Sequence, residues 1–188
     1  MLKKSKFLAV LMSAFFLLSF AGCSVVDQVK DSVAASGKDK TIVSKDGKFE
    51  VTVPGNWKEE TNLNPEANLQ VSNRLQEQYL VVIDESKQDF QADITLDEYA
   101  NLVKENMKSN GEDMSTGGDK EITVNGGTGK YFEVTGTVNK IKAKYVVVIT
   151  QDNDNIYQII SWSLVSKFDK NKDTLVKVAQ SLKATTAK

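Results

Sequence analysis

Alternation of apolar and polar residues marks the first strand of the folded part of the chain. Residues 49–53 read FEVTV, which predicts a half-buried strand that ends at the turn Pro54-Gly55. Residues 78–84 carry apolar side chains on both faces, so we expect a strand that is covered on both sides. Residues 68–74 predict its neighbour, and the short link 75–77 predicts a hairpin.

After residue 94, the spacing of the apolar residues changes from that of a strand to that of a helix. Thr95 and Glu98 have the spacing of a capping box, and Asn110-Gly111 supplies a stop signal, so the pattern predicts a helix over residues 95–109. Five apolar residues share one face of this helix: Leu96, Tyr99, Ala100, Val103 and Met107. We therefore expect an amphipathic helix packed on a sheet.

Four further strands are expected at residues 120–124, 129–138, 141–151 and 156–164. The links between them are short turns: Asn125-Gly126-Gly127, Asn139-Lys140 and Asp152 to Asn155. Such short links require antiparallel pairing, because a parallel return needs a crossover of about a dozen residues or more. A last helix is expected to begin between Ser166 and Asp169. The fold class is α+β, a largely antiparallel sheet of about six to seven strands with two packed helices.

The N-terminus has the layout of a secretory signal. Lys3, Lys4 and Lys6 precede an uncharged run, 7–22, that ends before Cys23. The sequence FAGC at residues 20–23 resembles the lipobox of bacterial lipoproteins, in which the cysteine is acylated. We expect a signal peptide over residues 1–22, lipidation of Cys23, a tether over 23–40 and one domain over 41–184. This predicts a lipid-anchored protein on the extracytoplasmic face of the cell membrane.

Composition narrows the chemistry that the domain can perform. The chain of 188 residues has no histidine, and Cys23 is its one cysteine. This excludes histidine-dependent catalysis, thiol catalysis and disulfides within the mature chain. Loss of the signal peptide removes three of the 24 basic residues against 25 acidic ones, and such an acidic chain argues against a nucleic-acid partner. We predict no catalytic residue, cofactor or metal ligand.

One acidic segment resembles the start of a calcium-binding loop, and a second gathers oxygen ligands in one tight turn. Asp169 to Asp173 reads DKNKD, but the sixth and twelfth positions of the loop are Thr174 and Gln180 rather than Gly and Glu. We expect this segment to cap the last helix. Asp152 to Asn155 reads DNDN, where a weak Ca²⁺ site and a solvated hairpin tip are both open interpretations, the tip being favoured.

Lysines and aromatic residues offer two further candidates. Lys140, Lys142 and Lys144 alternate along one strand and could contact anionic lipid headgroups, although a solvated strand face is the favoured interpretation. Six aromatic residues could line a pocket or pack in the core, the second being favoured: Trp57, Tyr79, Tyr131, Tyr145, Tyr157 and Trp162.

Several segments together resemble the PsbP-like fold family, over about residues 45–183. These are FEVTVPGNW at residues 49–57, TLDEY at 95–99, the glycine hairpin from Gly126 to Tyr131, the strand 156–164 and the final helix. The resemblance implies an α/β/α sandwich. It also implies a non-enzymatic binding or accessory module, without naming its partner.

The leading functional hypothesis is therefore a membrane-anchored, non-catalytic binding or accessory module that meets another envelope protein. The first alternative is a carrier for a small ligand or cation. The second is a carboxylate-dependent hydrolase, which would need two carboxylates facing each other across a cleft.

Overall fold

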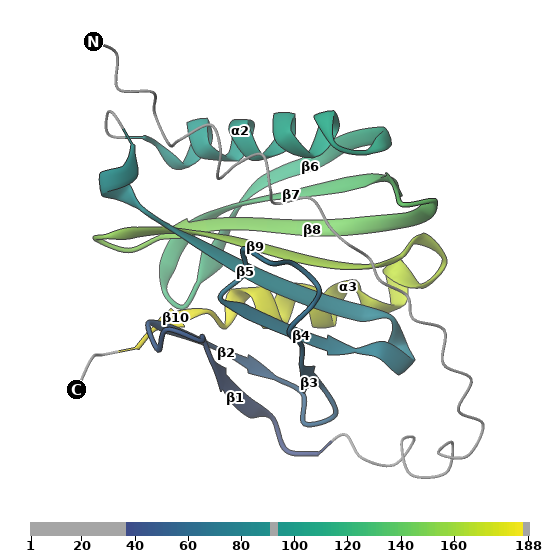
Figure 1. Cartoon of the computed structure of the whole chain (residues 1–188), viewed down its shortest axis with the longest axis horizontal. Helices are drawn as coiled ribbons and strands as arrows, with labels where there is room; N and C mark the ends of the chain where they lie inside the picture. Colours follow the sequence, from purple (N-terminus) through teal and green to yellow (C-terminus); the bar gives the residue numbers. More distant parts are fainter. Residues whose placement is uncertain (1–36, 91–93, 186–188) are drawn as a thin grey trace.

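The computed structural model describes residues 37–90 and 94–185, and its strands form two sheets (Figure 1). The large sheet is antiparallel in the order β3-β4-β5-β9-β8-β7-β6. Its strands are β3 (Lys58–Glu59), β4 (Leu69–Asn73), β5 (Gln78–Ser86), β6 (Glu112–Val124), β7 (Gly127–Val138), β8 (Ile141–Gln151) and β9 (Asn155–Leu164). The small sheet contains β1 (Lys40–Val43), β2 (Phe49–Val53) and β10 (Lys183–Ala184).

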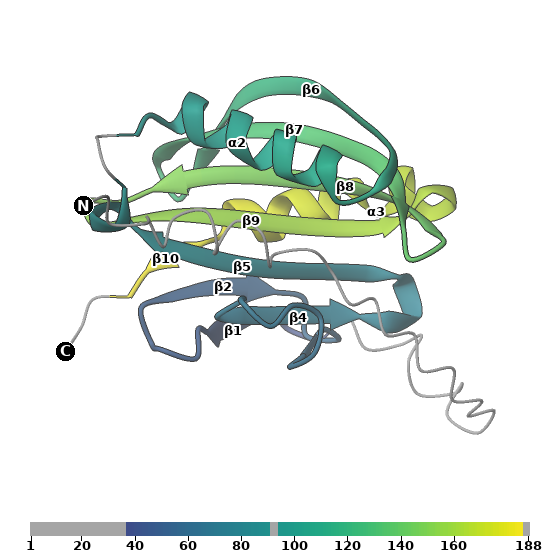
Figure 2. The ribbon, with the colours of Figure 1, turned by 45° about the horizontal axis from the view of Figure 1, so that its top comes forward.

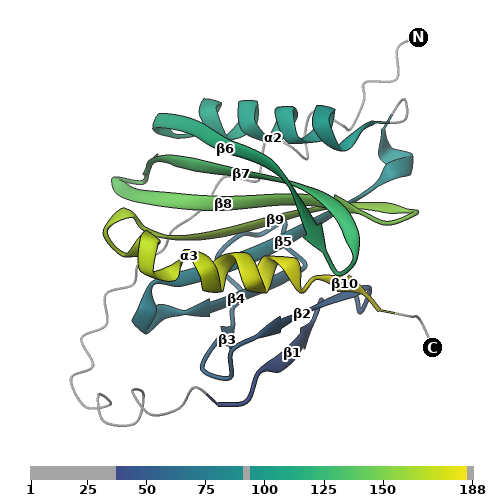
Figure 3. The ribbon, with the colours of Figure 1, turned by 180° about the vertical axis from the view of Figure 1, so that it is seen from behind.

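Two α-helices cover opposite faces of the large sheet. Helix α2 (Leu96–Ser109) packs on β6, β7 and β8, whereas α3 (Val165–Gln180) packs mainly on β9, β8 and β5. Figure 2 shows α2 in front of the sheet and α3 behind it, and Figure 3 shows α3 in front. The small sheet shares the α3 side, so the third layer of the sandwich combines a helix with three strands. Neither α2 nor α3, the α-helices of the described ranges, has the length and apolar character needed to span a bilayer.

Neighbouring residues of the central strands belong to different cores. On β7, Phe132 lies in the core beneath α2, while Tyr131 lies in the core shared by α3 and the small sheet. Val147 and Val146 on β8 divide in the same way, because successive side chains of a strand point to opposite faces. The apolar side chains on both faces of these strands are thus the reason for the three-layer arrangement.

Most of the predicted elements are confirmed. The predicted first strand matches β2, the 75–77 link is a hairpin turn containing the 3₁₀ turn η1 (Arg74–Gln76), and α2 has the capping box of Thr95 and Glu98. A second 3₁₀ turn, η2 (Lys87–Asp89), follows β5. The α+β class and the seven-stranded sheet with two helices are confirmed.

Strand β6 begins eight residues earlier than predicted. The prediction missed this part because its residues are almost entirely polar or glycine. It lies at the edge of the sheet and is mostly exposed, so it lacks the apolar alternation that reveals a strand. Its pairing with β7 shifts register twice, and Asp113 and Gly118 adopt positive φ at these two irregularities.

The predicted capping role of residues 169–173 is wrong. Helix α3 begins at Val165, so Asp169 is already inside the helix. Within this segment Asn171 is buried, and its Nδ2 donates to the Gln76 carbonyl at 2.7 Å and to Ser163 at 2.8 Å. Its Oδ1 accepts from the side chain of Gln78 at 3.0 Å, so Asn171 joins α3 to the β4–β5 hairpin.

The predicted signal peptide, Cys23 and the tether as far as residue 36 lie outside the described residues. The described chain begins with Gly37, and Lys40 opens the small sheet. The sequence did not predict this small sheet, because β1 and β10 contain only four and two residues.

The absence of a side chain at Gly129 allows β7 to pack closely against β8. A Cβ at this position would lie 2.9 Å from the Ile149 carbonyl oxygen, closer than real Cβ contacts, whereas at Gly127 the closest atom would be 3.5 Å away. Gly129→Ala should therefore lower the free energy of unfolding by about 1–3 kcal/mol. Chemical denaturation measures this loss, with Gly127→Ala as the matched control. Equal stabilities of the two variants would contradict the packing described here.

Candidate functional site

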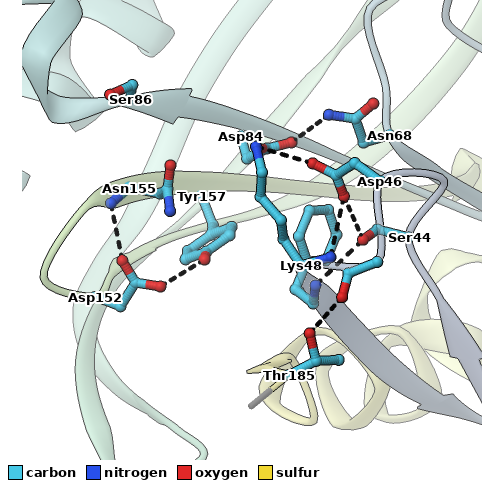
Figure 4. Close-up of polar contacts among 12 residues, drawn as sticks. Ser44, Asp46, Lys48, Asn68, Asp84, Ser86, Asp152, Asn155, Tyr157 and Thr185 are labelled. Carbon is cyan, nitrogen blue, oxygen red and sulfur yellow. Dashed lines mark hydrogen bonds and ion pairs between the residues drawn. The ribbon is translucent and has the colours of Figure 1, made fainter. Parts of the chain in front are cut away.

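One end of the domain collects turns that are far apart in sequence. It contains the β1–β2 turn, the end of β5, the start of α2, and the β6–β7 and β8–β9 turns. Register places them together, since Ser86 pairs with Asn155 and Gly129 with Thr150. Figure 4 shows polar contacts within the β1–β2 and β8–β9 turns and the contacts of Lys48 and Asn68 with Asp84 of β5. We call this region the acidic end.

Asp46 fixes the β1–β2 turn. Its carboxylate accepts from the Ser44 hydroxyl at 2.7 Å and from the Lys48 backbone N–H at 3.2 Å, and it pairs with the Lys48 ammonium at 3.0 Å. Burial alone would raise the pKa of Asp46, but the hydrogen bonds from Ser44 and Lys48 outweigh it and lower the pKa. Asp46 therefore stays ionised and holds the turn in one conformation.

Asp84 links the small sheet to the large one. Its side chain is only 5% exposed, accepts from the Asn68 amide at 2.6 Å and lies 3.9 Å from the Lys48 ammonium. Lys48 thus lies between the carboxylates of Asp46 and Asp84 (Figure 4). Sequence reasoning missed this contact, since Asp84 merely ends an apolar strand and Lys48 precedes another.

Asp152 organises the β8–β9 turn. One carboxylate oxygen accepts the backbone N–H groups of Asp154 and Asn155 at 2.9 and 2.8 Å, and the other accepts the Tyr157 hydroxyl at 2.6 Å. Burial alone would raise the pKa of Asp152, but the bonds from Tyr157 and the two N–H groups lower it. The turn uses both oxygens of Asp152, as the hairpin-tip interpretation requires. Residues 37–90 and 94–185 hold no group of three or more His, Cys, Asp or Glu arranged for a metal ion.

Glu85 is a partly buried carboxyl group of this end. It accepts a hydrogen bond from the Tyr99 hydroxyl, which links β5 to the first turns of α2. Burial raises the pKa of Glu85; the Tyr99 bond opposes that rise, and the neighbouring charges of Asp89 and Asp84 add to it. Its pKa therefore shifts in the opposite direction from those of Asp46 and Asp152.

Exposed carboxylates surround this internal network. Seven acidic residues are on the surface here: Asp46, Glu66, Asp89, Asp97, Glu98, Glu121 and Asp154. The lysines nearby are Lys45, Lys48, Lys87 and Lys130, and Lys130 is itself paired with Asp97 and Glu121. The acidic end therefore carries a strong negative charge, and its turns are held in place by hydrogen bonds.

A groove of about 220 Å³ lies between α2 and the strands β6 and β7. Lys104 of α2 pairs with Asp119 of β6, and Lys130 of β7 pairs with Asp97 at 2.9 Å, so ion pairs cross the groove. The Lys104 ammonium also lies 4.9 Å from the centre of the Phe132 ring. The lining thus offers balanced charges together with aromatic surface.

Lys142 and Lys144 share one face of β8, but the surroundings of the lysines singled out in the sequence differ. Lys140 occupies the β7–β8 turn with a φ of 66°, and Lys142 is exposed on β8. Lys144 instead pairs with Glu133 at 2.7 Å and lies 4.6 Å from the centre of the Phe168 ring. Glu133 also pairs with Lys172 at 2.5 Å; burial would raise its pKa, but these partners and Tyr131 lower it to about 2.

The six aromatic candidates are all buried, as core packing requires. Tyr79 and Trp162 stack with ring centroids 5.2 Å apart beneath α2. Tyr131 is the one of the six that lines the groove.

Asp152→Asn should lower stability at neutral pH. An amide keeps one acceptor oxygen but loses the charge and the bond from Tyr157, so we expect a loss of about 1 kcal/mol for this partly hydrated group. The pKa of Asp152 is lowered in the folded chain. Ionised Asp152 therefore contributes to stability above an unfolded pKa of about 3.9, and this contribution disappears as pH falls through the folded pKa. Urea denaturation at several pH values, with Asp154→Asn as control, checks both expectations. A loss that stays constant as the pH falls below 3.9 would contradict them.

Glu85→Gln should show the opposite pH dependence. The raised pKa of Glu85 means that stability is lost as pH rises from the unfolded pKa of about 4.3 through the folded pKa. The amide oxygen can still accept the Tyr99 hydroxyl and carries no charge. The variant should therefore gain stability relative to the native chain as pH rises through this window. The same denaturation series measures it, and a difference that is independent of pH would count against this assignment.

No protein-family model matches the chain, and no curated protein matches it in sequence. Solved structures do match. Cyanobacterial PsbP (CyanoP) from Synechocystis sp. PCC 6803 superposes with a TM-score of 0.59 at 13% identity, covering 88% of this chain and 99% of its own.

Two further structures have the same arrangement. LpqN, described as involved in cell envelope biogenesis of Mycobacterium tuberculosis, gives a TM-score of 0.54 at 12% identity, covering 79% of this chain and 91% of its own. The Ran-binding protein Mog1p of Saccharomyces cerevisiae gives 0.54 at 12%, covering 78% and 95%. At these identities the likeness concerns the fold. This chain has the PsbP-like α+β fold.

Proposed function

We propose that this chain is a lipid-anchored protein of the extracytoplasmic face of the cell membrane and acts as a non-catalytic binding module for another envelope protein. Its anchor would be Cys23, which follows the predicted signal peptide. A diacylglyceryl group would give lasting attachment, since two acyl chains suffice where one binds only marginally. The acidic end would then meet a basic surface of the partner.

The observation that carries this proposal is the combination of fixed turns and exposed carboxylates at the acidic end. Asp46 and Asp152 use internal hydrogen bonds to hold two turns, so little conformational entropy is lost when a partner binds there. The exposed carboxylates around them would speed encounter with a positively charged surface and select against acidic ones.

The structural neighbours support a binding role in general terms. One is described as Ran-binding and another as involved in cell envelope biogenesis. Both descriptions belong to those proteins, and the fold they share with this chain does not transfer a partner. The location in the envelope rests on the N-terminal pattern, and the choice of surface rests on the charge of the acidic end.

The groove beside α2 favours a second candidate function, that of a small-ligand carrier. Its volume of about 220 Å³ is below the range typical of drug-sized ligands, so the ligand would be small and polar. Lys104 and Lys130 would exchange their present carboxylate partners for those of the ligand.

A photo-crosslinking amino acid in living cells tests the leading proposal. Placed at Asp154 in the full-length chain, it should capture one defined envelope protein, while the same group at Glu105, an exposed position in the middle of α2, should not. Asp89→Lys in the chain that carries the crosslinker should abolish the adduct, because it reverses a charge at the contact surface. Glu105→Lys in the same chain should leave it.

The anchor is tested in parallel by mass spectrometry of the N-terminal peptide and by Cys23→Ala. Acylated Cys23 and a weaker adduct in Cys23→Ala agree with the proposal. Equal capture at Asp154 and Glu105, an adduct insensitive to Asp89→Lys, or substantial catalytic turnover by the purified chain would contradict it.

A further inference from the structure

The end opposite the acidic end has a different surface. It contains the β4–β5 turn, the end of α2, the start of β6, the β7–β8 turn and the start of α3. Register places these together, since Val138 pairs with Ile141, Glu112 with Thr137 and Ala143 with Leu164. Figures 1 and 3 show the β4–β5 hairpin, the β7–β8 turn and the start of α3 at the same end. We call this region the near end, because the described chain enters the domain on this side.

Two large apolar side chains are exposed at the near end. Leu75, in the 3₁₀ turn η1, is 68% exposed, and Val165, the first residue of α3, is 39% exposed. The turn that carries Leu75 is fixed, because Asn73 accepts the Gln76 N–H and the Asn171 amide donates to the Gln76 carbonyl. An exposed leucine on a fixed turn is a stable apolar projection rather than a side chain that folds back onto the surface.

Lysines without carboxylate partners lie at the same end of the domain as these side chains. Five exposed lysines of the near end make no ion pair with the residues that the structure describes: Lys108, Lys140, Lys142, Lys167 and Lys170. The carboxylates beside them are those of Glu77, Glu112, Asp113 and Asp169.

Charge is therefore divided unequally along the domain. The near end is slightly positive, while the acidic end gathers ten carboxylates against four lysines: Asp46, Glu66, Asp84, Glu85, Asp89, Asp97, Glu98, Glu121, Asp152 and Asp154 against Lys45, Lys48, Lys87 and Lys130. A negatively charged surface would repel the acidic end and accept the near end.

The described chain also enters the domain on this side. Strand β2 runs away from the β1–β2 turn of the acidic end, and Lys40 of β1 pairs with Val53 at the far end of β2. Gly37 accepts a hydrogen bond from the Gly55 N–H just beyond that point. Gly37 lies 14 positions after Cys23, a length of chain that cannot span more than about 50 Å.

We propose that the near end docks on an anionic bilayer, with Leu75 and Val165 in the headgroup region and the unpaired lysines against lipid phosphates. This inference rests on the proposed function for the anchor at Cys23, and it adds an orientation. Exposed apolar residues within a basic surround are suited to the interface between water and an anionic membrane. Docking would turn the acidic end away from the bilayer, toward the partner.

Fluorescence on vesicles tests the orientation. The full chain is attached to vesicles through residue 23, either by its natural lipid or, for unacylated protein, by coupling the Cys23 thiol to a maleimide lipid. An environment-sensitive fluorescent amino acid replaces Gln76 in one protein and Asp154 in another. On vesicles containing phosphatidylglycerol and spin-labelled lipid, the probe at position 76 should shift to shorter wavelength and be quenched. The probe at position 154 should do neither.

Matched variants separate docking from attachment. In the chain labelled at position 76, Leu75→Asp should abolish quenching, whereas Val43→Asp should not, because Val43 is a similarly exposed apolar residue, at 49%, next to the acidic end. Purely zwitterionic vesicles should weaken the quenching. Both attachment routes place residue 23 at the bilayer, so failure of natural acylation, read by mass spectrometry, counts against the proposed function and leaves this test intact.

Three results would overturn the proposal. The first is equal quenching at positions 76 and 154, and the second is no quenching at position 76. The third is a wavelength shift at position 76 that grows with protein density on the vesicle and occurs without quenching by lipid. That result would mean that a second copy of the chain covers the near end.

Discussion

The requirement to cover both faces of the central strands determines the rest of this structure. Tyr131 and Phe132, or Val146 and Val147, are adjacent in sequence and buried on opposite sides of the sheet. One helix on each face, with the small sheet added beside α3, removes these side chains from water. Burial of a residue such as valine or phenylalanine contributes about 1.5–3 kcal/mol, so the two cores together dominate the stability of the domain.

This arrangement leaves the charged residues mainly at the ends, the edge and the outer helix faces. Because the strands are antiparallel, every turn lies at one end or the other, and the charges of the turns divide between the two. The acidic end is also linked internally, by Asp46, Asp84 and Lys48 between the sheets and by Glu85 and Tyr99 between β5 and α2. The near end combines exposed leucine and valine with lysine. Two chemically different surfaces thus arise from one topological constraint.

Much of the fold could be predicted from local sequence. The capping box of Thr95 and Glu98 predicts the start of α2, and Asn139-Lys140 predicts a tight turn that the structure confirms with positive φ at both residues. Elements without an apolar period were missed, above all the first part of β6, which pairs mainly through its backbone. The capping role expected of Asp169 to Asp173 was wrong because these residue types resemble caps, whereas Val165, which opens α3, carries no such signal.

The candidate site could not be predicted in the same way. Asp46, Asp84 and Asp152 lie on separate strands and turns, and no spacing in the sequence relates them. They lie at the same end because β5 pairs with β9 and because Lys48 reaches from the small sheet to Asp84. Taken singly, each is an aspartate of the kind found at ordinary turns and strand ends. The sequence analysis interpreted Asp152 to Asn155 in that way.

The most direct measurement for the account as a whole is the reactivity of individual lysines in intact cells, compared with the purified chain by mass spectrometry. Lys45 and Lys87 at the acidic end, and Lys167 and Lys170 at the near end, should lose reactivity in cells, because a partner covers one end and the membrane the other. Lys177 of α3, which is exposed elsewhere on the domain, should keep it. Protection of Lys177 with both ends fully reactive would contradict the account.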